Sequence, residues 1–225
     1  VITYVGNSPT DKEHQKDVDV IEAPRSTGSI LKPYLYAAML NDGYILPQTL
    51  VPDVPTQISG YAPQNFNLTY DGAVPASRAL ARSLNIPSVL MLQDYSVNQF
   101  YEKLQQLKLR NVNRQPSNYG LSLILGGAES NLWDLCKAYA YMSSTLTYFN
   151  QNDSKYRKNE MLNLNYDADF QPDFGSSSRQ KNIFGAGAIW QTFNAMKEVN
   201  RPEGDEGWKF YDSSLEIAWK TGTSF

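Results

Sequence analysis

The sequence has very little of what many enzyme mechanisms use. It contains one histidine, His14, in the polar stretch TDKEHQKD, and one cysteine, Cys136. A Ser-His-Asp or Cys-His mechanism would depend on that single histidine, and an H-E-x-x-H zinc site is excluded. One cysteine excludes an internal disulfide and a cysteine-rich metal site, and we expect Cys136 to lie in the core on an apolar helix face. A serine enzyme of this composition needs a base other than histidine.

The chain also lacks a basic excess and long hydrophobic runs. Its 20 Lys and Arg against 23 Asp and Glu give a formal net charge of -3, so the positive field that nucleic-acid binding needs is missing. No run approaches the roughly 18 apolar residues that span a bilayer. The 41% hydrophobic and 19% charged content of its 225 residues is typical of a globular domain. We expect no nucleic-acid partner, no metal and no cofactor, with any targeting segment outside this chain.

Hydrophobic periodicity predicts helices in the middle of the chain and strands at both ends. Val1–Val5 and the final LEIAWKTGTSF favour strands that pair in one sheet, which gives an α+β fold. The stretch 44–75 is rich in proline and is predicted to be a long ordered loop, and the polar stretch 149–182 a mobile insertion. Helices are predicted over 29–40, from Pro75 to about 85, from Pro87, over 97–109, over 130–143 with Ser130 as its N-cap, and over 185–199.

Three short motifs occur in order along the chain. They are Ser29-Ile30-Leu31-Lys32, Ser83-Leu84-Asn85 and Lys220-Thr221-Gly222-Thr223. S-x-x-K followed by S-D-N and K-T-G is the signature of serine β-lactamases and penicillin-binding proteins.

Each motif is weak on its own, because two spacings recur elsewhere in the chain. Ser178 and Lys181 repeat the first spacing, and Ser96 and Asn98 repeat the second. Ser178 lies in a polar stretch with no apolar helix behind it, and Ser96 is better placed as a helix N-cap. Neither is taken as a site.

Ser29 and Lys32 form a candidate pair of nucleophile and base. Ser29 begins a buried helix just after Gly28, and Lys32 falls on the same face three residues later, so the side chains are expected to meet. A lysine can take a serine proton only if its pKa falls from about 10.4, which burial and the positive charge of Lys220 would both achieve. Pro33 removes the amide that would bond to the carbonyl of Ser29, which predicts a distorted first turn.

The other two motifs offer groups that bind and relay. The Ser83 hydroxyl can carry a proton and the Asn85 amide can hold a peptide carbonyl, although both residues could equally be helix caps. On the predicted last strand, Gly222 lets a ligand backbone lie close, and the hydroxyls of Thr221 and Thr223 can bind a carboxylate. The bland alternative for this segment is a strand that ends in a turn.

At these residues the chain resembles the transpeptidase domain of class A penicillin-binding proteins. The resemblance extends through VITYVGN, APRSTGSILKPYLYAAML, VPDVPTQISGYAPQNF, VPASRALARSLNIPSVLML, YGLSLILGGAES and IAWKTGTSF. It implies the fold shared with serine β-lactamases, an antiparallel sheet flanked by helices with an all-helical region, as one domain over 1–225. It also implies a chain truncated at both ends, without the first strand of its sheet and the segment after K-T-G-T.

The resemblance implies a mechanism as well. Ser29 would be acylated by the terminal D-Ala-D-Ala of a peptidoglycan stem peptide, or by a β-lactam, with Lys32 as base and Ser83 as proton carrier. Asn85 would position the peptide. Lys220, Thr221 and Thr223 would hold the terminal carboxylate beside Gly222, and the amides of Ser29 and Thr223 would form the oxyanion hole. The full-length protein would carry a glycosyltransferase domain and an N-terminal anchor at the periplasmic face of the inner membrane.

Two alternatives remain at this stage. A serine β-lactamase uses the same acylation groups but hydrolyses the acyl-enzyme quickly, which needs a further base and a placed water. A non-catalytic penicillin sensor or scaffold would keep the fold only. Turnover of a penicillin distinguishes the first from a transpeptidase, and cross-linking by a Ser29→Ala protein tests the second.

Overall fold

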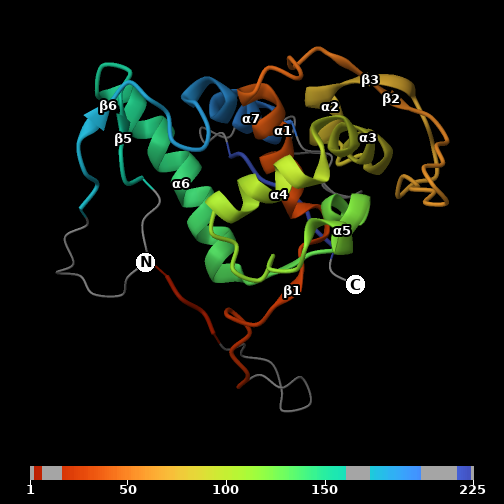
Figure 1. Cartoon of the computed structure of the whole chain (residues 1–225), viewed down its shortest axis with the longest axis horizontal. Helices are drawn as coiled ribbons and strands as arrows, with labels where there is room; N and C mark the ends of the chain where they lie inside the picture. Colours follow the sequence, from red (N-terminus) through yellow and green to blue (C-terminus); the bar gives the residue numbers. More distant parts are fainter. Residues whose placement is uncertain (1–2, 7–16, 161–172, 199–216, 224–225) are drawn as a thin grey trace.

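The chain folds mainly into helices, with three short antiparallel strand pairs. A computed structural model describes residues 3–6, 17–160, 173–198 and 217–223. The helical elements in Figure 1 are η2 (Gly28–Leu31), α1 (Lys32–Asn41), α2 (Ala76–Ala81), α3 (Asn85–Tyr95), α4 (Val97–Gln106), α5 (Pro116–Tyr119), η3 (Gly120–Leu125), α6 (Leu132–Gln151) and α7 (Ala186–Lys197). The strands are β1 (Arg25–Ser26), β2 (Leu50–Asp53), β3 (Gly72–Pro75), β4 (Glu129–Ser130), β5 (Tyr156–Arg157) and β6 (Ser177–Ser178).

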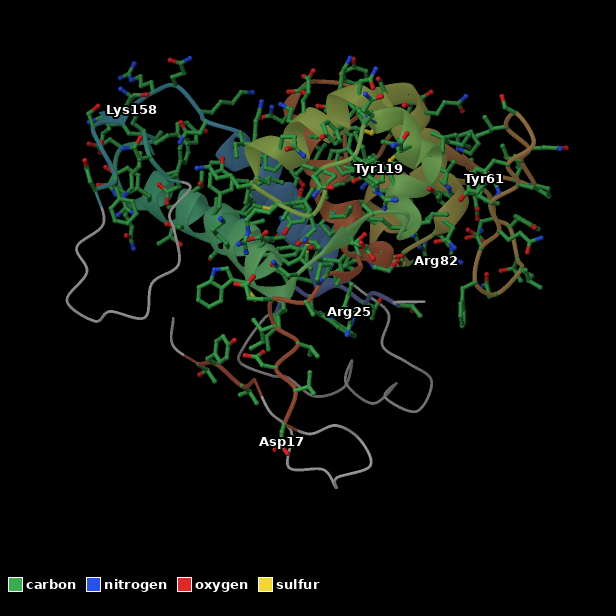
Figure 2. The ribbon with its side chains drawn as sticks, turned by 60° about the horizontal axis from the view of Figure 1, so that its bottom comes forward. Asp17, Arg25, Tyr61, Arg82, Tyr119 and Lys158 are labelled. Atoms are coloured by element: carbon green, nitrogen blue, oxygen red, sulfur yellow. The ribbon has the colours of Figure 1, made fainter. Side chains whose placement is uncertain are left out.

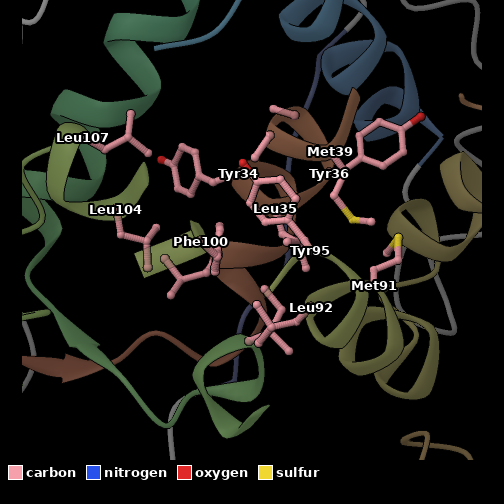
Figure 3. Close-up of a cluster of buried hydrophobic side chains, with 14 of the residues drawn as sticks. Tyr34, Leu35, Tyr36, Met39, Met91, Leu92, Tyr95, Phe100, Leu104 and Leu107 are labelled. Carbon is pink, nitrogen blue, oxygen red and sulfur yellow. The ribbon is translucent and has the colours of Figure 1, made fainter. Parts of the chain in front are cut away.

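Helix α1 is the centre of the hydrophobic core. Every residue from Lys32 to Met39 is buried, because α2, α3, α4 and α7 pack around the helix. A helix that is apolar on all sides is stable only inside such a layer of helices. Figure 3 shows the resulting cluster, in which Tyr34 and Leu35 of α1 face side chains of α3 and α4 such as Leu92 and Phe100.

The first turn before α1 is distorted, as the sequence predicts. Residues Gly28–Leu31 form a 3-10 helix, and the N–H of Lys32 donates to the carbonyl of Ser29. Pro33 stands in the first turn of α1, where an α-helix tolerates the missing amide. The motif Ser29-Ile30-Leu31-Lys32 therefore spans the junction between a 3-10 turn and an α-helix.

The stretch 44–75 is more regular than predicted at both of its ends. Strand β2 pairs with β3, with Val51 opposite Val74 and Asp53 opposite Gly72. Proline is compatible with such a two-stranded pair because each strand keeps one unpaired edge. The pairing brings the ends of the 54–71 loop together, and Figure 1 shows this loop extending away from the helices.

The predicted terminal sheet is absent from the described residues. Neither 3–6 nor 217–223 is in a strand. The amide of Trp219 donates to the carbonyl of Met196, in the last turn of α7, at 3.4 Å. The remaining strand pairs are β1–β4, β2–β3 and β5–β6, and the last of these lies within the stretch predicted to be a mobile insertion. The α+β class is confirmed.

Three predictions about α6 are wrong. The cap is Asn131, whose side chain accepts from the amide of Asp134, and Ser130 lies in β4. Cys136 is exposed, not in the core. The buried face of α6 runs through Asp134, Lys137 and Tyr141, and Cys136 is two residues from Asp134 and so points away from that face. The helix also continues to Gln151 instead of ending near 143, since no Gly or Pro interrupts it.

Candidate active site

Lys32 lies under Ser29 at the start of α1. In a 3-10 helix, side chains three residues apart eclipse one another, so the spacing places Ser29 and Lys32 on the same side of the turn. Ser29 is partly exposed, whereas Lys32 is only 2% exposed. The nucleophile candidate therefore faces solvent while the base candidate is inside the protein.

The ammonium group of Lys32 is held by the turn between α2 and α3. Its Nζ donates to the carbonyl oxygens of Ser83 at 2.8 Å and Leu84 at 3.2 Å, and to Asn85 Oδ1 at 2.7 Å. Ser83 Oγ lies 3.5 Å from the same nitrogen. Within the described part of the chain, the Ser29 hydroxyl is not among these acceptors. The donors of Lys32 are directed to the oxygens of 83–85, so the meeting of the Ser29 and Lys32 side chains stays a prediction.

The electrostatics of the site lower the pKa of both lysines. Burial lowers the pKa of Lys32 well below 10.5, and the positive charge of Lys220 lowers it further. Burial lowers the pKa of Lys220 to about 8. The neutral form of Lys32 is therefore populated at a lower pH than the neutral form of a lysine on the surface.

A single hydroxyl joins the two lysines. Lys220 Nζ donates to Ser83 Oγ at 2.7 Å and to the carbonyl of Thr221 at 2.7 Å. Ser83 adopts a left-handed backbone with φ 55°, a conformation that costs a residue with a Cβ about 1–2 kcal/mol. That geometry turns the chain sharply between α2 and α3, so that the Ser83 hydroxyl and the carbonyls beside it face Lys32 and Lys220.

Two glycines let the K-T-G-T segment run directly against the start of α1. A Cβ on Gly28, which has φ +49°, would lie 2.2 Å from the carbonyl oxygen of Thr223 and 2.9 Å from its nitrogen. A Cβ on Gly222 would lie 2.7 Å from Ile30 Cγ1. The backbone of Thr223 therefore lies beside the residue that precedes Ser29, while Thr221, Gly222 and Thr223 stay exposed.

The sequence did not predict that residues 126–128 pack against the segment that leads into Gly28. Ser26 Oγ donates to the carbonyl of Gly126 at 2.9 Å, and the amide of Thr27 donates to the carbonyl of Ala128 at 3.0 Å. A Cβ on Gly126 would come within 3.0 Å of Gly28 Cα. The glycine pair in LILGGAES was the available signal, because adjacent glycines often mark a close approach of two backbone segments.

The sequence reasoning also assigned no role to Gln64 and Asn65. The Asn85 Nδ2 group donates to the carbonyl of Gln64 at 2.8 Å, and the Asn85 amide donates to Asn65 Oδ1 at 3.0 Å. Both residues belong to the 54–71 loop, which reaches out past Arg82 and carries Tyr61 in Figure 2. The motif YAPQNF stood out only as part of the resemblance.

The repeated S-x-x-K spacing is not a site. Ser178 lies in β6, and its hydroxyl bonds to the backbone of Gln180. Lys181 Nζ instead donates to Asn41.

The remaining expectations about single residues have mixed outcomes. Ser96 is at the N-cap position of α4, but its side chain makes no capping hydrogen bond. His14 lies outside the described residues. Over 3–6, 17–160, 173–198 and 217–223, no group of three or more His, Cys, Asp or Glu could hold a metal ion.

Comparison with known proteins agrees with the fold and the motifs. The family model for the penicillin binding protein transpeptidase domain matches residues 1–225. The chain is 34% identical over 212 residues to penicillin-binding protein 1C of Escherichia coli (strain K12), and 30% identical over 212 residues to penicillin-binding protein 1B of Vibrio cholerae. These matches cover 92% and 91% of this chain but only 24% and 26% of the relatives. The chain thus spans about a quarter of their length.

Solved structures share the fold at low sequence identity. A peptidoglycan glycosyltransferase from Burkholderia ambifaria superposes with a TM-score of 0.65 at 14% identity, over 92% of this chain and 65% of that one. Penicillin-binding protein 1A from Haemophilus influenzae gives a TM-score of 0.59 at 18% identity, over 84% of this chain and 32% of that one. Together, the family model and the relatives show that the chain belongs to the penicillin-binding protein transpeptidase domain family.

Proposed function

We propose that this chain, as one domain over 1–225, is a D,D-transpeptidase that cross-links peptidoglycan stem peptides through an acyl-Ser29 intermediate. The observation that carries the proposal is the buried Lys32, one 3-10 turn from Ser29, with its pKa lowered by burial and by Lys220. A base of this kind would take the role of histidine, and no histidine occurs in the described part of the chain. The same chemistry makes penicillins acylating inhibitors.

In the proposed acylation, neutral Lys32 takes the proton of the Ser29 hydroxyl while Ser29 Oγ bonds to the carbonyl carbon before the terminal D-alanine. The amides of Ser29 and Thr223 stabilise the oxyanion. The carbon–nitrogen bond then breaks, and the proton passes from Lys32 through Ser83 Oγ, 3.5 Å away, to the departing amine. Hydrogen bonds of this type commonly tighten only when substrate binds, so we expect the hydrogen bond between Ser29 and Lys32 to form in the complex with substrate.

The second half of the proposed reaction reverses the proton path. The amine of a neighbouring stem peptide attacks the carbonyl carbon of the acyl-Ser29 ester, so that a new amide bond forms and the ester bond to Ser29 Oγ breaks. The proton lost by the amine passes back through Ser83 and Lys32 to Ser29 Oγ. Transfer to water instead would be carboxypeptidase activity. Asn85 holds the peptide, and its side chain is already oriented by Lys32 and Gln64.

The proposed carboxylate site consists of Lys220, Thr221 and Thr223. Lys220, with its pKa near 8, is largely protonated at neutral pH, and charge-assisted hydrogen bonds to a carboxylate are about twice as strong as neutral ones. The exposed Thr221 and Thr223 hydroxyls add donors. Gly222 has no side chain to block a peptide that lies along this segment.

The relatives suggest a wider setting for this domain. We propose that it works at the periplasmic face of the inner membrane, in a longer protein that is also a peptidoglycan glycosyltransferase, as the name of the Burkholderia ambifaria neighbour indicates for that protein. Among the helices of the described residues, none has the length and apolar content to cross a bilayer. The anchor would belong to another part of the protein.

Intact-mass measurement after incubation with penicillin tests the proposal. We expect one stable adduct that maps to Ser29, its loss in Ser29→Ala, and its retention in the matched control Ser178→Ala. Rapid release of the adduct would favour a β-lactamase. Cross-linking of stem peptides by a Ser29→Ala protein at the wild-type rate would refute the mechanism.

A further inference from the structure

Two buried polar residues, Asp53 and Asn65, lie next to the motif Ser83-Leu84-Asn85, called the S-x-N motif below. Asp53, on β2, is 1% exposed, and Asn65, in the 54–71 loop, is 2% exposed. Asn65 Nδ2 donates to Asp53 Oδ1 at 2.7 Å and to the carbonyl of Thr69 at 3.0 Å. The other carboxylate oxygen, Asp53 Oδ2, accepts from the amide of Asp71 at 3.0 Å. The pair thus fixes the loop to the β2–β3 ribbon.

The same asparagine caps the helix that carries Asn85. Asn65 Oδ1 accepts from the amides of Asn85 at 3.0 Å and Ile86 at 3.3 Å. These are the first two amides of α3, which have no partner within the helix. The residue at the N-cap position is Leu84, whose side chain cannot accept a hydrogen bond. Asn65 thus caps α3 from the 54–71 loop, whereas a capping serine or aspartate usually stands at the N-cap position itself.

The side-chain amide of Asn65 uses both of its N–H groups and its oxygen in hydrogen bonds, and these bonds fix the orientation of the amide. Its two N–H groups reach Asp53 and Thr69, and its oxygen receives Asn85 and Ile86. A flipped amide would turn donors toward two backbone N–H groups. Asp53 therefore selects the orientation in which the oxygen faces α3.

The orientation of the Asn65 amide affects the surroundings of Lys32 through Asn85. With its backbone held by Asn65, Asn85 donates from Nδ2 to the carbonyl of Gln64 at 2.8 Å and presents Oδ1 to Lys32 Nζ at 2.7 Å. The carbonyls of Ser83 and Leu84, which also bind Lys32, immediately precede this anchored residue. One buried amide thus controls the place of the S-x-N motif relative to the base.

We propose that Asn65, oriented by Asp53, is a positioning residue for the reaction at Ser29. It touches no substrate in this account, and it acts by holding Ser83 and Asn85 against Lys32. Its effect on rate rests on the proposed function, whereas its effect on the start of α3 does not. A displacement of about 1 Å in such a site can cost about a hundredfold in rate.

The test compares single changes with an exchange of the two side chains. Asn65→Ala removes the cap, and Asn65→Asp places a second carboxylate against Asp53. The double variant Asp53→Asn with Asn65→Asp exchanges the two roles, so that residue 53 donates and residue 65 accepts. The matched control is Asn67→Ala, an exposed asparagine in the same loop whose side chain accepts only from the amide of Thr69.

Four quantities are measured on each variant. They are the rate of Ser29 acylation by a fluorescent penicillin, the dissociation constant for that penicillin, the melting temperature, and hydrogen exchange at the amides of Asn85 and Ile86. We expect Asn65→Ala and Asn65→Asp to slow acylation by about a hundredfold, with a smaller change in the dissociation constant and faster exchange at both amides. The double variant should recover most of the acylation rate lost in Asn65→Asp. Asn67→Ala should match wild type.

The outcomes separate the two proposals. Absence of acylation in the wild type defeats the proposed function, and exchange at Asn85 and Ile86 still decides whether Asn65 holds them. Wild-type acylation in Asn65→Ala, unchanged exchange at both amides, or a double variant as slow as Asn65→Asp overturns the positioning role. If Asn65→Ala does not fold, Asn65→Asp and the double variant give the same comparison.

Discussion

Replacing Gly28 with alanine should disable the site at a modest cost in stability. Gly28 has φ +49°, and a Cβ there would stand 2.2 Å from the carbonyl oxygen of Thr223. Unstrained contacts between carbon and oxygen begin at about 3.3 Å, so the backbone of Thr223 must retreat by about 1 Å or Gly28 must change conformation. Either movement separates the amides of Ser29 and Thr223 that the proposed oxyanion hole requires.

The two consequences have different sizes. An alanine in the left-handed region costs about 1–2 kcal/mol, and each kcal/mol lowers the melting temperature of a domain of this length by about 2–4 °C. A catalytic backbone displaced by about 1 Å loses about a hundredfold in rate. Acylation should therefore fall far more than stability does.

Gly43 supplies the matched control for this experiment. Its φ is +79°, yet a Cβ there would meet no heavy atom within 4 Å. Gly43→Ala should lower the melting temperature as Gly28→Ala does while Ser29 is acylated by a fluorescent penicillin at the wild-type rate. If Gly28→Ala also acylates at the wild-type rate, or if both variants are equally slow, the close approach of Thr223 is not what organises the site.

Three further changes test the cap of α6, the core and the carboxylate site. Asn131→Ala removes the acceptor for the Asp134 amide at 2.7 Å and should lower stability by about 1 kcal/mol in thermal denaturation without slowing acylation; an unchanged melting temperature would count against the cap. Leu35→Ala, in the fully buried part of α1, should cost about 2–5 kcal/mol in urea unfolding, and a loss below about 1 kcal/mol would contradict its place in the core. In an unreactive Ser29→Ala protein, penicillin binding should weaken as pH rises through about 8, because Lys220 loses its positive charge there. Adding Lys220→Met should remove this pH dependence. A binding affinity that does not change with pH in the Ser29→Ala protein would contradict the role of Lys220.

The sequence was sufficient to predict the helix that follows Ser29. The apolar spacing from Ile30 to Met39 predicts a buried helix, and α1 is buried from Lys32 to Met39. Pro33 predicts a distorted first turn because a missing amide has a local consequence, and a 3-10 turn is found there. Features that depend on neighbours along the chain were accessible in this way.

The sequence was not sufficient to predict which atoms meet in the site. The partners of Lys32 depend on the left-handed backbone of Ser83. A serine in the sequence gives no indication that its backbone will be left-handed. The cap of α3 comes from Asn65, twenty residues earlier in the chain, whereas sequence rules look for a cap beside the helix. Cys136 was misplaced because the polar residues Asp134 and Lys137 occupy the buried face of α6, which a hydrophobic pattern does not reveal.

The burial of α1 connects the stability of the fold to the proposed chemistry. A lysine at the same spacing on an exposed helix would keep a pKa near 10.4 and hold its proton at neutral pH. Lys32 is surrounded by the packing that forms the core, and burial is the larger of the two causes that lower its pKa. The oxygens of Ser83, Leu84 and Asn85 offset the cost of placing an amine there. The packing that stabilises the helices thus also lowers the pKa of the proposed base, whereas Ser178 and Lys181 repeat the same spacing in and after the short strand β6.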